Sequence, residues 1–145
     1  MNATLLITMI SLIFEHQEMN VTYDSLEGEE IISLYINWTT RGGDEISKNI
    51  FHQDLIIQFD EDNSLKYVDK HEYLFYINTA ASRYERRASI IYANFERTSA
   101  KAIIRDHILD DDYSIFHHLT LRSDRGIWKI KKIIFSRSEE CPVNH

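Results

Sequence analysis

The chain has 145 residues, of which 43% are apolar and 12% aromatic, enough for the core of one small domain but crowded for two. The formal net charge is −7 and basic residues never stand more than two in a row, so the electrostatic footprint of a nucleic-acid-binding protein is missing. The single cysteine, Cys141, excludes an intrachain disulfide and a cysteine-based metal cluster. We therefore expect no nucleic acid partner, no metal and no cofactor.

The first residues contain an apolar run, at positions 5–14. It is about half as long as the roughly 20 residues that a bilayer-spanning helix needs, so no membrane partner is expected. No Lys or Arg precedes it and no small-residue cleavage site follows, so most parts of a secretory signal peptide are missing. We expect residues 1–22 to be an extension or an extra helix, 23–138 to be the domain and 139–145 a tail. The expected location is the cytoplasm, with an exported form left open.

Three helices are predicted in the first half of the domain. The first takes Asp24 or Ser25 as its N-cap, carries an amphipathic stripe and ends before Gly42. The second runs over 44–50, and Asp69 caps the third. All three show one apolar face, which must be buried against another element.

The rest of the domain has the alternating pattern of strands. Two extended segments, 55–59 and 65–68, lie between the second and third helices. Four further strands are predicted at 84–97, 100–109, 114–123 and 127–136. Their short turns favour an antiparallel meander. The predicted fold class is α+β, a curved antiparallel sheet wrapped around about three helices, cone-like, with one apolar pocket.

Several strings in this order resemble the nuclear transport factor 2-like superfamily, which includes ketosteroid isomerases and SnoaL-like polyketide cyclases, and within it the lumazine-binding branch. The strings are Tyr35–Trp38 ahead of Gly43-Asp44, then Phe51–Asp54, Phe116–Leu121 and Gly126–Phe135. The resemblance covers nearly all of residues 25–136 and implies the cone-shaped fold. It implies no single activity, because this fold hosts enzymes and binding domains alike. Phe59 stands where the isomerases carry their general base, which argues against isomerase chemistry. His117 stands where the lumazine-binding branch commonly has an aspartate, which argues against a ligand inferred from the branch name.

Strand registers can be proposed from the apolar alternation, because a slip of one residue turns the core set outward. Two-residue turns at Arg97-Thr98 and Asp111-Asp112, together with a matching last hairpin, place four polar residues in one row on the concave face. These are Ser89, Asp106, His117 and Lys132. Such a row could orient a polar ligand, or it could shift the pKa of His117 and let it move protons. The alternative is a solvated edge or a satisfied hydrogen-bond network.

Aromatic side chains are the other candidates for ligand binding. They come from the first helix, the first strand and the third helix, and could stack on a flat ligand: Tyr35, Trp38, Phe59, Tyr73 and Tyr76. A plain apolar core explains the same residues equally well. His52 is a further candidate, with a role as a helix cap or packing residue as the alternative.

Three functions fit these patterns. The first is a small-molecule-binding module without catalysis, whose pocket takes an aromatic or heterocyclic compound. The second is an isomerase, cyclase or dehydratase that uses His117 and Asp106 as an acid/base pair. The third is an interaction domain that acts through its sheet face. The outer face is expected to expose Ile90, Tyr92, Ile103, Phe116, Ile133 and Phe135, which predicts a homodimer joined through the sheets.

Overall fold

The structure is a computed structural model that describes residues 23–80, 85–109 and 112–138. A short 3₁₀ turn, η1 (Tyr23–Ser25), precedes three helices and six strands. The helices are α2 (Gly28–Arg41), α3 (Asp44–Ile50) and α4 (Lys70–Ala80). The strands are β1 (Phe51–Glu61), β2 (Ser64–Tyr67), β3 (Arg86–Phe95), β4 (Ser99–Ile108), β5 (Tyr113–Asp124) and β6 (Ile127–Ser138).

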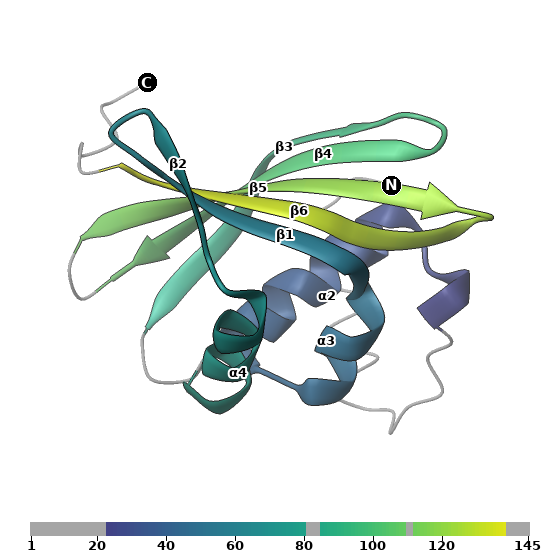
Figure 1. Ribbon diagram of the computed structural model, residues 1–145, viewed down its shortest axis with the longest axis horizontal. Coiled ribbons are helices and arrows are strands. Elements are labelled where there is room, and N and C mark those ends of the chain that lie inside the picture. Colours follow the sequence, from purple (N-terminus) through teal and green to yellow (C-terminus); the bar gives the residue numbers. More distant parts are fainter. Residues whose placement is uncertain (1–22, 81–84, 110–111, 139–145) are drawn as a thin grey trace.

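All six strands form one sheet in the order β2-β1-β6-β5-β4-β3. The meander β3 to β6 is antiparallel, as predicted. The first long strand, β1, lies parallel to β6, so the sheet is mixed. The sheet curves over the helices, which all lie on one side of it (Figure 1). The predicted α+β class, a curved sheet around three helices, is confirmed.

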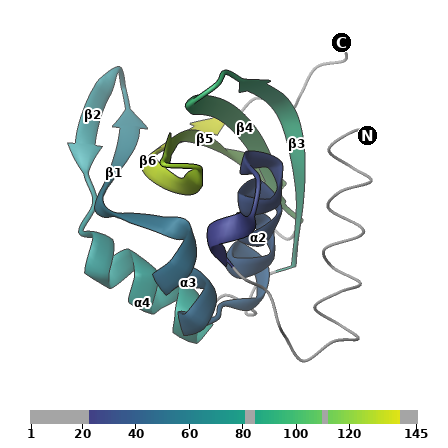
Figure 2. The same cartoon turned by 90° about the vertical axis from the view of Figure 1, so that its right-hand side faces the viewer.

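The core fills the space between the helices and the concave face of the sheet. Seen along the strands, α2 lies inside the curl of the sheet while α3 and α4 cover its open side (Figure 2). The stripe predicted on the first helix is completely buried, because Ile31, Leu34, Tyr35 and Trp38 have no exposed surface. Inward side chains of β4, β5 and β6 meet it, with Ile104, Leu119, Leu121, Ile130 and Ile133 at 1% exposure or less. Apolar burial on this scale is the main force that holds helices and sheet together.

The helix starts follow from local hydrogen bonds. Helix α4 begins as predicted, since the Glu72 N–H donates to Asp69 Oδ1 at 2.9 Å. Helix α2 begins later than predicted, because Asp24 and Ser25 lie in the 3₁₀ turn and Glu27 takes the N-cap position. The Glu27 N–H donates to Glu30 Oε1 at 3.3 Å, which satisfies a backbone donor that the helix cannot.

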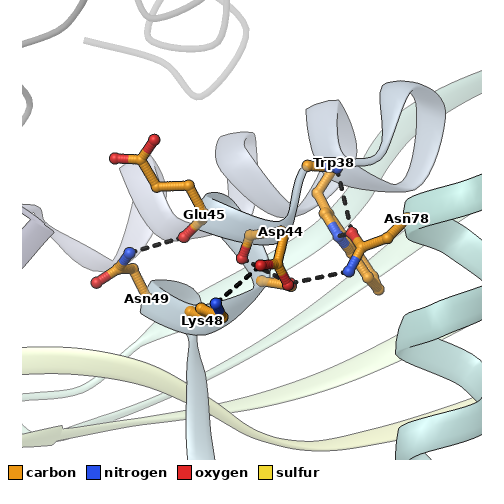
Figure 3. A network of polar contacts seen from close by, with 8 residues as sticks. Trp38, Asp44, Glu45, Lys48, Asn49 and Asn78 are labelled. Atoms are coloured by element: carbon orange, nitrogen blue, oxygen red, sulfur yellow. Dashed lines mark hydrogen bonds and ion pairs between the residues drawn. The ribbon is translucent and has the colours of Figure 1, made fainter.

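One asparagine of α4 joins the three helices (Figure 3). Asn78 Oδ1 accepts from the Trp38 indole at 2.8 Å and from the Gly43 N–H at 3.1 Å, while its amide donates to Ser47 Oγ at 3.3 Å. Gly42, between α2 and α3, has φ 75°, and a Cβ there would lie 2.9 Å from the Ile77 carbonyl oxygen. Glycine is therefore required where the chain passes this close to α4.

The predicted register of the last hairpin is wrong. Arg125 and Gly126 both have positive φ and form a two-residue turn, so Leu121 lies opposite Ile130. The register then shifts again, and His117 lies opposite Phe135 rather than Lys132. The second shift reverses which side chains of β6 face inward.

The other two hairpins also differ from the prediction. The β3–β4 pairing starts as expected, with Phe95 opposite Ala100, but a bulge near Ile91 places Ala88 rather than Ser89 opposite Asp106. The β4–β5 connection is longer than a two-residue turn, so Asp106 lies opposite Ile115 rather than His117. This second difference is an even number of residues, so Asp106 and His117 still face the same side of the sheet.

No helix within the described ranges is long and apolar enough to span a membrane.

Candidate functional site

A cavity of about 450 Å³ lies between α4 and the concave face of the sheet. This volume is within the range of small-molecule sites. Its wall is mostly apolar and aromatic, and includes Phe59, Tyr73, Tyr76, Ile108, Ile115 and Phe135. Three polar residues, Arg86, Asp106 and His117, also line it. An apolar wall with a few convergent polar groups is the usual composition of a small-molecule site.

Asp106 is the centre of the polar groups. It is only 1% exposed, and its Oδ2 lies 3.2 Å from Arg86 Nη1 and 3.4 Å from His117 Nε2. The second carboxylate oxygen, Oδ1, has no hydrogen-bond partner, and neither has Arg86 Nη2, although both atoms are buried. A buried polar atom without a partner costs about 1–3 kcal/mol. The cavity therefore holds one unpaired acceptor, Asp106 Oδ1, and one unpaired donor, Arg86 Nη2, on neighbouring residues.

His117 is held at both ring nitrogens. Its Nδ1 lies 2.7 Å from the Tyr35 hydroxyl, and its Nε2 faces Asp106. A carboxylate only accepts, so the proton of the neutral ring belongs on Nε2, and Nδ1 accepts from the Tyr35 hydroxyl. Phe135 packs edge-on against the imidazole, with ring centroids 4.9 Å apart. The ring is therefore fixed in orientation and tautomer, and both its nitrogens are engaged within the protein.

Burial sets the protonation states here. It lowers the pKa of His117 below the ordinary value, although the neighbouring Asp106 carboxylate acts in the opposite direction. Burial also raises the pKa of Tyr35 and that of Tyr73. The imidazole is thus neutral and both phenols are protonated at pH 7.

The depressed pKa of His117 predicts that the fold loses stability in mild acid. The unfolded chain binds a proton at this position below about pH 6.5, while the folded protein resists it, so stability is complete above that pH and falls below it. This residue alone should contribute a slope of up to about 1.4 kcal/mol per pH unit. Urea unfolding between pH 5 and 7.5 measures the slope.

Two variants separate this effect from general titration. His117→Gln removes the buried imidazole and should flatten the slope, whatever its effect on stability at pH 7.5. His71→Gln removes an exposed imidazole of α4 and should leave the slope of the wild type. Equal slopes in all three proteins would contradict the assignment.

The structure brings together part of the predicted polar row. Asp106 and His117 meet as predicted, but the predicted convergence of Ser89 and Lys132 with them is wrong. Ser89 is exposed, and Lys132 pairs with Thr120, a residue of the outer-face groove. The bulges in β3 and β6 account for both errors, since each reverses the facing of the residues beyond it.

The aromatic candidates divide into two groups. Phe59, Tyr73 and Tyr76 line the cavity. Tyr35 and Trp38 are completely buried core residues beside it, and the Tyr35 hydroxyl contacts the site residue His117. His52 is far from this group, in a different pocket near the start of β1.

Arg86 is the charged site residue that the sequence interpretation missed; among the apolar wall residues it also missed Ile108, Ile115 and Phe135. Arg86 lies at the start of β3, and its side chain is 13% exposed. The Arg86-Arg87 pair has the pattern of a solvated surface. The available signal was the alternation along this strand, which places Arg86 on the same face as Ala88 and Ile90. In the structure these three residues are partly buried, while Arg87 and Ser89 are exposed.

The outer face of the sheet is less apolar than predicted. Ile133 and Phe135 belong to the buried core and Ile90 packs against it, so their assignment to the outer face is wrong. Tyr92 and Ile103 do line an outer-face groove of about 540 Å³. Among the described residues no group of three metal-binding side chains occurs.

The fold and cavity define a class of protein. The chain is similar in structure to a nuclear transport factor 2-like protein of unknown function from Shewanella baltica, at 18% identity and TM-score 0.62, covering 77% of this chain and 90% of that one. A similar protein of unknown function from Silicibacter pomeroyi matches at 15% identity and TM-score 0.62, covering 74% and 90%. A "putative ketosteroid isomerase" from Shewanella frigidimarina matches at 14% identity and TM-score 0.53, covering 74% and 93%. These similarities establish the nuclear transport factor 2-like fold.

The family is shown by sequence. A family model described as "putative lumazine-binding" matches residues 26–136. The chain belongs to this family, and it has the nuclear transport factor 2-like fold. No curated protein matches the chain.

Proposed function

We propose that the protein is a small-molecule-binding module whose cavity under the sheet takes a flat heterocycle. The observation that carries this proposal is the buried, half-satisfied pair Asp106 and Arg86 in a mostly apolar cavity. Natural proteins satisfy nearly all their buried polar groups, so two free atoms in one cavity support a ligand that completes them. The family description names a heterocycle, but His117 departs from the pattern of the branch, so the proposal rests on the cavity rather than on that description.

The free atoms define the edge of that ligand. Asp106 Oδ1 accepts and Arg86 Nη2 donates, so the matching edge has an N–H beside a carbonyl, as in a cyclic amide or ureide. Tyr73 and Phe135, with ring centroids 5.3 Å apart, offer aromatic surface for the rest of the ring. The neutral His117 adds no charge, which favours an uncharged ligand.

Methylation of the ligand tests this edge. Lumazine carries ring N–H groups beside carbonyls, while its N,N′-dimethyl derivative keeps the ring and lacks those donors. Isothermal titration should give a dissociation constant for lumazine about ten to a hundred times lower than for the dimethyl compound, because a buried acceptor left unpaired costs about 1–3 kcal/mol. Asp106→Asn should remove most of the difference.

The control is Ser89→Ala, which changes an exposed residue of β3 and should bind like the wild type. Equal binding of both compounds would contradict the proposed edge while preserving the pocket. Absence of binding by lumazine and by other cyclic amides and ureides would contradict the proposed function.

The second candidate is an enzyme of the cyclase or dehydratase kind. The same carboxylate favours it, since Asp106 Oδ1 faces no protein partner and can accept a proton from a bound substrate. His117 then serves to position Asp106, because its own nitrogens are engaged by Tyr35 and Asp106. Turnover of a compound that binds the cavity, lost in Asp106→Asn, distinguishes this candidate from a pure binding module.

The third candidate is an interaction domain that acts through the outer face. The groove lined by Tyr92, Ile103 and Ile134 supports it, and two copies joined there would form a symmetric dimer. Light scattering on the samples used for titration gives the mass in solution. The cavity and the outer face are independent surfaces, so pairing and ligand binding are compatible.

A further inference from the structure

A third pocket lies at the turn end of the last hairpin, where β5 and β6 meet the start of β1. Its volume is about 460 Å³. Three cationic side chains line it, Arg122, Lys129 and Lys131, together with His52 and a single carboxylate, Asp124. The chain as a whole carries a net charge of −7, so this local excess of positive charge opposes the overall balance.

Two of the cations face each other, and Asp124, the one carboxylate that lines the pocket, forms an ion pair with neither. Arg122 and Lys129 lie directly opposite each other on β5 and β6, an arrangement in which like charges destabilise a sheet. Within the described part of the chain, none of the three cations has a carboxylate at ion-pair distance. The Lys129 ammonium donates to the Asn49 carbonyl in the last turn of α3, which orients it and leaves two of its three N–H donors unused.

The backbone is irregular at the same place. Lys131 is skipped in the pairing of β6 with β5 and again in its pairing with β1. On the facing strand, residues 52–55 likewise have no partner, and His52 turns back to accept the Asp54 N–H at 3.0 Å. A bulge redirects a side chain, and bulges are more frequent beside binding sites. Here the bulge adds Lys131 to the like-charged pair of Arg122 and Lys129.

We propose that this pocket binds the phosphoryl group of a small phosphorylated molecule. Three cations around one concave site match the charge and the several acceptor oxygens of a phosphate. The volume exceeds that of a phosphate ion alone, which favours an ester or a diphosphate. The net charge of −7 opposes binding of a long polyanion, which favours a small anion over a nucleic acid.

Titration calorimetry at constant ionic strength tests the site, with inorganic phosphate, pyrophosphate and adenosine monophosphate as probes. The wild type should bind pyrophosphate or adenosine monophosphate more tightly than phosphate. Tighter binding of adenosine monophosphate identifies an ester, and tighter binding of pyrophosphate identifies a diphosphate. Arg122→Gln and Lys131→Gln should each weaken binding about tenfold or more, because a hydrogen bond to a charged group contributes about 1.5–3 kcal/mol. Lys131→Arg should retain binding, since it preserves the charge.

The matched control is Arg87→Gln, which removes one cation from an exposed position on β3 and should leave the affinity within about twofold. All these positions are at least partly exposed, and a urea melt of each variant verifies that it is folded. Three results would overturn the proposal: no binding of any probe at millimolar concentration, affinities of the Arg122 and Lys131 variants equal to the wild type, or a single-stranded RNA that binds more tightly than all three probes.

Discussion

Replacing Trp38 by alanine should lower the free energy of unfolding by about 3–5 kcal/mol, the usual cost of truncating a buried tryptophan. The side chain has no exposed surface and packs against Phe51 and Tyr73, with ring centroids 5.0 and 5.8 Å away. Its indole also donates to Asn78, which ties α2 to α4 (Figure 3). Urea denaturation measures the loss, which is large beside the 5–15 kcal/mol typical of a whole domain.

Two further variants divide that loss between packing and hydrogen bonding. Trp38→Phe keeps an aromatic ring but removes the indole N–H, and should cost less because Asn78 Oδ1 still accepts from Gly43. Tyr67→Ala removes an aromatic ring that is 79% exposed and should change stability by no more than about 0.5 kcal/mol. A Trp38→Ala protein as stable as the Tyr67→Ala protein would show that the core between α2 and the sheet is assembled differently.

The helices and strands could be predicted because their signals are local. Asp69 caps α4 as its sequence context indicates, and the stripe from Ile31 to Trp38 is buried as its spacing indicates. These features depend on residues within one or two turns of one another. The parallel pairing of β1 with β6 was not predicted, because no local pattern reports which distant strand completes the edge of a sheet.

The candidate site was predicted in part, because a register error of an even number of residues keeps a side chain on its face of the sheet and an odd one does not. The error in the β4–β5 register is an even number of residues, so Asp106 and His117 remained on the concave face. The β3 and β6 bulges each shift the pairing by one residue. Ser89 and Lys132 therefore do not face the concave side beside Asp106, and Arg86 does. A bulge inserts one extra residue into a strand whose apolar alternation looks regular on either side of it. The sequence alone does not show where that extra residue lies.

Each of the two proposed sites holds a pair of residues that departs from the usual rules of stability. Most of the core between the helices and the sheet is apolar. The Asp106–Arg86 pair is buried with free atoms, and the Arg122–Lys129 pair sets like charges side by side. Local departures from the rules of stability are expected where a protein binds something, because the ligand supplies the missing partner.

Removing Asp106 should destabilise the fold as strongly as removing Trp38 does. Asp106→Ala leaves Arg86 buried without a counter-charge, and losing one partner of a buried ion pair costs about 3–5 kcal/mol. Adding Arg86→Met removes the stranded charge, so the double variant should lose about 1–3 kcal/mol less than the sum of the single losses. Urea denaturation of the four proteins gives this coupling energy.

The matched pair is Lys66 and Glu61, whose charged atoms are closer, at 2.8 Å, but whose side chains are 63% and 52% exposed. Its coupling energy, from Lys66→Met and Glu61→Ala, should be much smaller than that of the buried pair, because water screens an exposed pair. Equal coupling energies for the two pairs would mean that Arg86 reaches solvent in the folded protein. The donor that completes the ligand edge would then be hydrated already, and Asp106 alone would define the polar end of the cavity.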